Sequence, residues 1–133
     1  MAENYVVKEY LTDAMVDAGA ELTQRLLDSG FPISAAFWLW DPEVDDDWRL
    51  IFSSPEASMY ENLDRIFAAR DRMDPKTSAL LRDAINQMMP DSELVRAIRT
   101  TYPTGDTLVR RRIKRRAPNN GQYIHDALLY RAV

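Results

Sequence analysis

The chain has 133 residues, of which 46% are hydrophobic and 29% charged, which fits one folded domain with an ordinary core and argues against a largely disordered protein. It contains no cysteine, so disulfides, thiolate nucleophiles and thiolate metal sites are excluded. Its net charge of −4 is uneven, because residues 1–74 carry 16 acidic and 6 basic side chains (−10) whereas residues 75–133 carry 5 acidic and 11 basic ones (+6).

The N-terminal part predicts a cytoplasmic protein that begins with a helix. Met1 to Tyr5 lack the basic and apolar regions of a secretion signal, and the longest apolar run, Ala35 to Trp40, is far shorter than the roughly 20 residues that span a membrane. We therefore expect a cytoplasmic protein of bacterial type with no membrane partner. Apolar residues recur every three or four positions from Val6 to Ser29, which predicts an amphipathic helix ended by Gly30.

The pattern of residues 33–53 predicts a β-hairpin that contains all three tryptophans of the chain. Its first strand is apolar on both alternating faces, with Trp38 and Trp40 on the same one. Such a strand is covered on both faces, or is covered on one and contacts a partner with the other. Trp38 and Trp40 are therefore candidate interface aromatics, together with Ile51, if one face of the sheet is left open by the helices.

Two of the following segments have clear helix signals. The second helix begins at Ser53 or Ser54, because the first would complete a capping box and the second would place a proline at the first helical position. We expect it to end near Arg72. A later helix begins with Asp91 as its cap and ends at the Pro-Thr-Gly sequence of residues 103–105.

The segment between these two helices allows two interpretations. Asp74 and Pro75 have the residue types of a helix start, and an apolar stripe continues at helical spacing to Met89. Pro90, however, disfavours helical geometry in the residue before it. Residues 85–89 are therefore either the end of a third helix or a short strand.

A second hairpin is predicted over residues 107–131, with its turn at residues 118–121, where Asn-Gly tolerates the positive φ of tight turns. Four basic side chains alternate along its first strand and project from one face: Arg110, Arg112, Lys114 and Arg116. Residues on the same side of a strand lie about 7 Å apart, which resembles the phosphate spacing of a nucleic-acid strand. These four are candidate nucleic-acid or acidic-partner residues, unless the face is solvated or paired within the chain.

These elements together predict a single α+β domain over residues 1–133. The sheet is antiparallel and is built from the two hairpins at 33–53 and 107–131, with three or four helices packed mainly on one face. The sequence has no repeat, no low-complexity stretch and no linker long enough to separate two domains.

Four segments carry a resemblance that spans nearly the whole chain: Phe31-Pro32, Ala36 to Leu39, Trp48 to Leu50 followed by Ser54-Pro55, and Asp126 to Arg131. In these segments the chain resembles a group of small uncharacterised bacterial α+β proteins of about this length. The segments consist of core and turn residues, so the resemblance implies a shared fold rather than a shared chemistry. No activity is known for that group, and its segment matching residues 83–89 is more strand-like.

The sequence shows no motif typical of an enzyme or a cofactor site. The acidic turn from Asp41 to Asp47 alternates carboxylates like a calcium-binding loop, but the glycine and the final glutamate of that loop are missing. His125 is the single histidine, and its neighbour Asp126 points to the opposite face of a strand, so they form no catalytic pair. We therefore expect no catalytic residue, no metal and no cofactor.

The combined observations favour a non-enzymatic protein-interaction or regulatory module whose partner is another protein or, in a homodimer, a second copy of the chain. The excess of aromatic residues in the first hairpin and the opposed charges of the two halves support this interpretation. The alternative is a nucleic-acid-binding protein that uses the basic strand at residues 110–116.

Overall fold

The structure is a computed structural model that describes residues 10–43, 47–55, 58–116 and 123–133. It forms a single α+β domain with four helices and a five-stranded sheet, as the sequence predicts. In chain order the elements are α1 (Asp13–Asp28), β1 (Ala35–Trp40), β2 (Arg49–Ser53), α2 (Met59–Asp71), α3 (Pro75–Ala79), β3 (Ile85–Gln87), α4 (Glu93–Thr101), β4 (Arg111–Arg116) and β5 (Ile124–Ala132).

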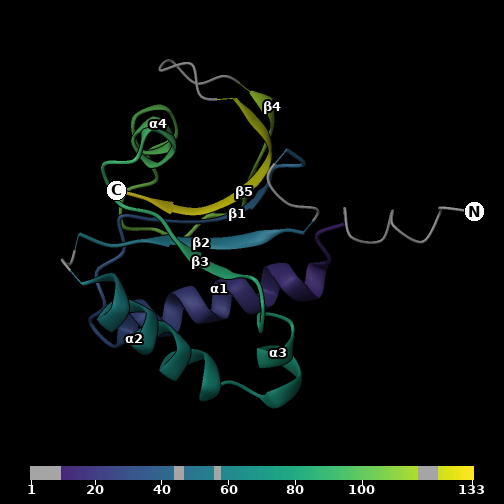
Figure 1. The fold of residues 1–133 in the computed structure, drawn as a ribbon, viewed down its shortest axis with the longest axis vertical. Helices are drawn as coiled ribbons and strands as arrows, with labels where there is room; N and C mark the ends of the chain where they lie inside the picture. Colours follow the sequence, from purple (N-terminus) through teal and green to yellow (C-terminus); the bar gives the residue numbers. More distant parts are fainter. Residues whose placement is uncertain (1–9, 44–46, 56–57, 117–122) are drawn as a thin grey trace, which may run out of the picture.

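The strand order in the sheet is β3-β2-β1-β5-β4. The β2–β3 pair is parallel, and the other three neighbouring pairs are antiparallel. Helices α1, α2 and α3 lie on one face of the sheet and α4 lies alone on the other (Figure 1). Every helix in the described part of the chain is too short or too polar to cross a membrane.

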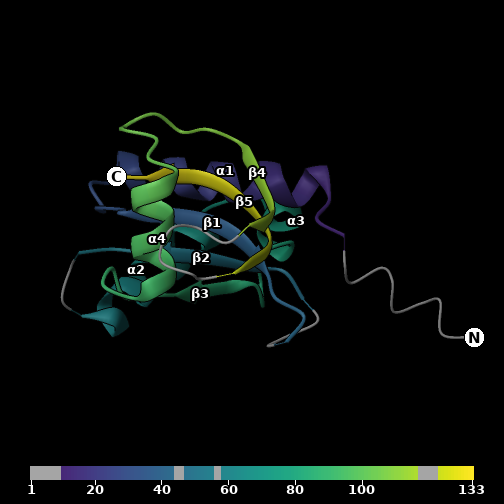
Figure 2. The same cartoon turned by 90° about the horizontal axis from the view of Figure 1, so that it is seen from above.

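The central strand β1 is covered on both faces, which explains its two apolar sides. Ala36 and Trp38 belong to the core under α1 and α2. Ala35 and Phe37 belong to a second core under α4. The view from above shows that α4 crosses only part of its face of the sheet (Figure 2). That incomplete cover leaves part of the α4 face without a helix, beside β2 and β3.

Helix α1 begins later than its apolar pattern predicts. The Thr12 hydroxyl accepts a hydrogen bond from the Met15 N–H at 3.1 Å and caps the helix, so residues 10–12 precede it. The predicted residues 6–9 lie outside the described part of the chain. The predicted end is confirmed, because Gly30 has a φ of +84° immediately after the helix.

The start of α2 was predicted wrongly. Ser53 pairs with Ala35 at the end of β2, so the sheet holds the residue that the sequence assigns to a helix cap. The cap is instead Ser58, whose hydroxyl accepts a hydrogen bond from the Glu61 N–H at 3.2 Å. The predicted end is confirmed, since Arg72 is the C-cap residue.

The segment from Asp74 to Pro90 contains a short helix and then a strand, so the strand interpretation is correct. Asp74 caps α3 by accepting hydrogen bonds from two backbone N–H groups, as predicted. Residues 85–87 then pair with β2, and the Met88 N–H continues this pairing to the Phe52 carbonyl at 3.1 Å. The next helix, α4, is capped by Ser92 rather than by Asp91, because the Ser92 hydroxyl accepts from the Val95 N–H.

The second hairpin is present, with a shorter first strand than predicted. Regular pairing in β4 begins at Arg111, and residues 107–110 lead into it without strand structure. The last strand, β5, lies between β1 and β4 and pairs with both. The predicted turn at residues 118–121 lies outside the described residues.

Candidate binding groove

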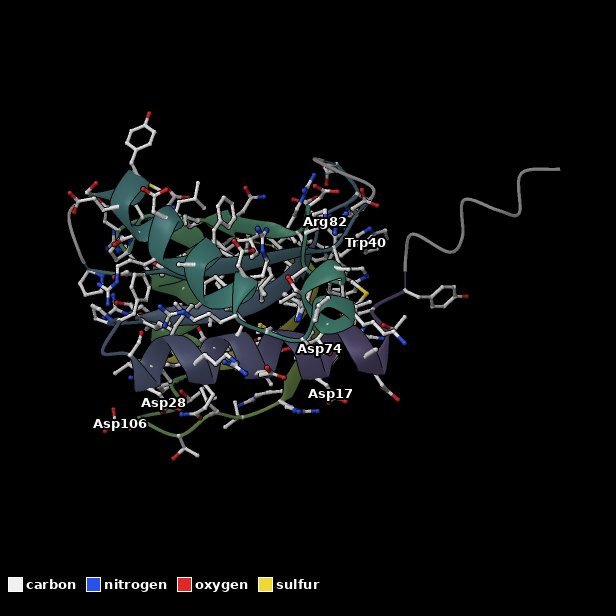
Figure 3. All side chains as sticks on the ribbon, turned by 90° about the horizontal axis from the view of Figure 1, so that it is seen from below. Asp17, Asp28, Trp40, Asp74, Arg82 and Asp106 are labelled. Atoms are coloured by element: carbon white, nitrogen blue, oxygen red, sulfur yellow. The ribbon has the colours of Figure 1, made fainter. Side chains whose placement is uncertain are left out.

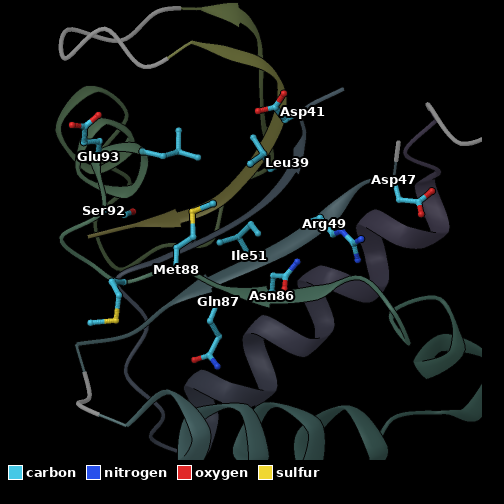
Figure 4. A pocket seen from close by; sticks show the side chains of 12 residues that line it. Leu39, Asp41, Asp47, Arg49, Ile51, Asn86, Gln87, Met88, Ser92 and Glu93 are labelled. Carbon is cyan, nitrogen blue, oxygen red and sulfur yellow. The ribbon is translucent and has the colours of Figure 1, made fainter. Parts of the chain in front are cut away.

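A groove lies on the α4 face of the sheet, between α4 and the edge strand β3 (Figure 4). It encloses a cavity of about 600 Å³. Its lining comes from β1, β2, β3 and α4 and their flanking residues: Leu39, Asp41, Asp47, Arg49, Ile51, Asn86, Gln87, Met88, Met89, Ser92, Glu93 and Leu94. We refer to this site as the α4 groove. Its volume is within the range of about 300–1,000 Å³ typical of ligand pockets.

The floor of the α4 groove is apolar. Ile51 is buried, and Leu39, Met88 and Leu94 are half-buried at the margin of the core beneath α4. Figure 4 shows the labelled side chains of Leu39, Ile51 and Met88 around the same space. Met89 continues this surface outward and is exposed. Methionine side chains are flexible and polarizable, so a floor rich in them adapts to the shape of a ligand.

The rim of the α4 groove is polar and mainly acidic. It carries three carboxylates, from Asp41, Asp47 and Glu93, and the guanidinium of Arg49. The Arg49 Nη1 donates a hydrogen bond to the Asp83 carbonyl at 2.7 Å, which ties β2 to the segment before β3. An acidic rim over an apolar floor favours a ligand with apolar groups and positive charge.

Strand β3 is anchored next to the groove by a side chain. The Gln87 amide nitrogen donates to the carbonyl of Met59, the first residue of α2, at 2.8 Å. The backbone of β3 is paired with β2 on one side, and β3 is the last strand at that end of the sheet. The groove therefore opens along a sheet edge that is held firmly in place.

Two of the four cations of the predicted basic face, Arg110 and Arg112, form ion pairs within the chain. Arg110 precedes the strand and forms an ion pair with Asp17 of α1, with its Nη1 2.7 Å from the carboxylate. Arg112 donates two hydrogen bonds to Asp126 of β5, at 2.5 and 2.6 Å, and its guanidinium lies 5.3 Å from the centre of the Trp48 ring. The hydrogen bonds to Asp126 raise the pKa of Arg112, and burial opposes that shift.

The other two predicted cations are placed differently. Lys114 is exposed and shares a face with Arg112, two residues away. Arg116 lies in β4 opposite Ile124, but its side chain is outside the described residues. The structure therefore brings Arg112 and Lys114 together on one strand face, with one of the two charges neutralised by Asp126.

The two predicted interface aromatics lie on the face of the sheet that α1, α2 and α3 cover, opposite the α4 groove. Trp38 is fully buried, and its Nε1 donates to the Tyr130 hydroxyl at 2.9 Å. Trp40 is half-buried, and its ring centre lies 6.5 Å from that of Trp48. Figure 3 shows Trp40 at the end of the sheet near α3. Trp38 therefore has no surface to offer a partner, and Ile51 is the predicted contact residue that lines a groove.

The acidic turn and the histidine, which the sequence treats separately, meet in the structure. The ligand atoms of Asp41, Glu43 and His125 all lie within 4.8 Å of one another. They come together because Trp40, the last residue of β1, pairs with Asp126, which places Asp41 across from His125. Two other predicted turn residues, Asp45 and Asp46, lie outside the described part of the chain.

The groove residues from the second half of the chain were missed in the sequence. Met88, Met89 and Leu94 belong to a strand exit and a helix start, and their apolar pattern resembles that of ordinary core residues. The sequence feature that could have indicated the groove is the second apolar face of β1, because such a face is covered by other elements or contacts a partner. Local sequence does not show that α4 stops short of Leu39.

We compared the chain with models of protein families, with curated proteins and with solved structures, and found no match in any of the three. The resemblance to small bacterial α+β proteins therefore stays a prediction.

Proposed function

We propose that the chain is a non-enzymatic binding module that holds a segment of a partner protein in the α4 groove. The observation that carries this proposal is the apolar cavity of about 600 Å³ between α4 and the edge of the sheet. A folded domain buries apolar side chains where it can, so an open apolar groove with a polar rim is typical of an interaction site.

The position of the groove supports an extended protein segment as its occupant. β3 is an edge strand, so one side of its backbone is free of sheet pairing within the described residues. An extended segment pairs with such an edge through its own backbone and places alternate side chains on one face of the sheet. Here that face is the α4 groove, whose floor contains Ile51 and Met88.

The charge of the rim supports a segment with apolar residues flanked by lysine or arginine. Three carboxylates and one guanidinium line the groove, so its rim is net negative. Charge complementarity of this kind selects partners and speeds association, while the apolar floor contributes most of the affinity.

Nucleic-acid binding by β4 has weaker support. Two of the four predicted cations, Arg110 and Arg112, already form ion pairs with Asp17 and Asp126. A phosphate contact made by Arg110 or Arg112 would have to replace its ion pair, which reduces the gain in free energy from counterion release. We therefore favour a protein ligand, and the experiment below distinguishes it from nucleic-acid binding.

A panel of short synthetic peptides tests the proposal. Peptides with alternate apolar residues and basic flanks are titrated into the protein, and the methyl resonances of Leu39, Ile51, Met88 and Leu94 are followed by NMR. We expect these resonances to shift with a peptide that has basic flanks and to shift less when the flanks are acidic. Met88→Ser should weaken binding about tenfold or more, because burying a methionine side chain contributes about 1.5–3 kcal/mol.

The matched control is Leu80→Ser, which changes an exposed leucine that follows α3 and does not line the groove. It should leave peptide binding unchanged. The proposal is wrong if no peptide shifts the groove methyls. It is also wrong if the groove methyl resonances shift with protein concentration, through self-association, and not with a peptide. Binding of DNA or RNA through β4 at low salt, without binding of any peptide, would contradict it as well.

A further inference from the structure

The cluster of Asp41, Glu43 and His125 lies at the end of the sheet next to the α4 groove. The His125 Nε2 lies 3.2 Å from the Glu43 Oε2 and 3.9 Å from the Asp41 Oδ1. Asp41 also lines the groove. We propose that these three side chains bind a divalent transition-metal ion such as Zn²⁺. This proposal does not depend on the proposed function.

The spacing of the three donors fits one metal ion. Nitrogen and oxygen ligands bind Zn²⁺ at about 2.0–2.1 Å, so two ligands at a tetrahedral angle lie about 3.3 Å apart. The separation of His125 and Glu43, 3.2 Å, is close to this value, and that of His125 and Asp41, 3.9 Å, is longer than it. All three ligand atoms lie within 4.8 Å of one another, so we expect the carboxylates to rotate when they bind one ion.

The types of donor select the kind of ion. Two carboxylates balance the charge of a divalent cation, and a neutral imidazole contributes a nitrogen ligand. Mg²⁺ and Ca²⁺ prefer oxygen ligands in larger number, whereas Zn²⁺ accepts a mixed set of nitrogen and oxygen. Three protein ligands leave one tetrahedral position open to water or to another ligand.

Two of the three ligands are held in place by the fold. The side chains of His125 and Asp41 are only 28% and 34% exposed, whereas that of Glu43 is 81% exposed. The Tyr123 ring meets the His125 ring edge-on, with 4.7 Å between the ring centres, and limits its rotation. His125 lies within β5, and the Asp41 Oδ1 accepts a hydrogen bond from the Glu43 N–H at 3.0 Å, so the fold positions both side chains. Glu43 is the exposed ligand that completes the site.

The experiment uses the whole untagged chain, because an added histidine tag would itself bind Zn²⁺. His125 is the single histidine, so its imidazole resonances report on the site without assignment. We expect ZnCl₂ to shift or broaden these resonances and to reach saturation at one ion per chain, and MgCl₂ to have no such effect. Isothermal titration calorimetry measures the affinity of the same protein.

Variants identify the ligands. His125→Gln and Asp41→Asn should each weaken Zn²⁺ binding about tenfold or more, since even changes in the partners of metal ligands have effects of that size. The control Asp106→Asn removes an exposed carboxylate elsewhere and should leave the affinity unchanged. The proposal is overturned if Zn²⁺ leaves the His125 resonances of the unaltered protein in place. It is equally overturned if His125→Gln and Asp41→Asn bind Zn²⁺ as well as the unaltered protein does.

Discussion

Gly19 lets α1 pack closely on the sheet at the buried pair Trp38 and Tyr130. A Cβ atom at this position would lie 2.6 Å from the Tyr130 hydroxyl oxygen and 2.7 Å from the Trp38 Nε1. Alanine stabilises a helix by about 0.5–1 kcal/mol relative to glycine, but overpacking a core costs about 1–3 kcal/mol. We expect Gly19→Ala to lower the free energy of unfolding by about 1–2 kcal/mol in urea denaturation.

A second variant tests the cause of that loss. Tyr130→Phe removes the hydroxyl oxygen that the new methyl group would contact first. Gly19→Ala should therefore destabilise the Tyr130→Phe protein less than it destabilises the unaltered one, in a double-mutant cycle. Equal losses in both backgrounds would show that crowding at the hydroxyl is not the cause.

The buried phenol of Tyr130 makes the free energy of unfolding fall at alkaline pH. Burial raises the pKa of Tyr130 well above its ordinary value, and the hydrogen bond from Trp38 opposes that shift. The unfolded chain ionises this tyrosine at about pH 10, so its contribution to stability is complete below that pH and is lost as the pH rises further. We expect a smaller loss of stability above pH 10 in Tyr130→Phe, measured by urea unfolding at several pH values.

An exposed tyrosine provides the control for this pH dependence. Tyr60 is 87% exposed, so Tyr60→Phe should leave the slope of stability against pH unchanged. The slope is the quantity to compare, because Tyr130→Phe also removes the hydrogen bond to the Val16 carbonyl. Identical alkaline slopes for all three proteins would contradict the prediction.

Single residues differ in how far the sequence predicts their role. Gly30 follows a periodic apolar segment, so its place at a helix end is a local pattern, and its φ of +84° agrees with that pattern. Gly19 lies in the middle of a helix, where local rules count a glycine as unfavourable. Its role depends on Trp38 and Tyr130, which are distant in sequence, so the chain alone does not predict it.

At the scale of elements, local patterns predict those segments whose neighbours in space are also their neighbours in sequence. The β1–β2 hairpin and the cap at Asp74 are of this kind. The predicted start of α2 was wrong because Ser53 pairs with Ala35 in the sheet, and this strand pairing takes the place of a helix cap. The helical stripe ending at Met89 was not a helix in its second half, because residues 85–87 complete the free edge of β2.

The ion pair between Arg112 and Asp126 joins β4 to β5 and gives a testable contribution to stability. The carboxylate is 14% exposed and receives two hydrogen bonds from a guanidinium that is 42% exposed. A lysine ammonium cannot bind both oxygens in this geometry. We expect Arg112→Lys to lower the free energy of unfolding by about 1 kcal/mol, measured by urea denaturation.

Arg110→Lys is the matched control, because Arg110 makes a more exposed pair with Asp17 through one nitrogen. Figure 3 shows Asp17 on the outer side of α1. We expect Arg110→Lys to lower the free energy of unfolding by less than about 0.5 kcal/mol. An equal effect of the two substitutions would mean that the double hydrogen bond at Asp126 adds nothing to stability.

At the scale of the whole molecule, the acidic and basic halves of the sequence are mixed in space. Arg110 from the basic half pairs with Asp17 from the acidic half, and β5 lies between β1 and β4. The charge balance of each half therefore does not describe a face of the protein. The α4 groove, with its net negative rim, combines residues from both halves.

The candidate site was predictable only in outline. The two apolar faces of β1 indicate that both are covered or contact a partner, and the structure has α4 over Phe37 and the open groove at Leu39. Where α4 ends on the sheet depends on the path of the chain through β3. That path is set by contacts between distant segments, so the position of the groove does not follow from local sequence.

The central place of β5 has a consequence for the order of folding. Both of its neighbours, β1 and β4, precede it along the chain. Until residues 124–132 leave the ribosome, β4 has no strand to pair with, and β1 keeps an unpaired edge. Because β4 pairs with β5 alone, both strands of the second hairpin join the sheet only after the last strand has been synthesised.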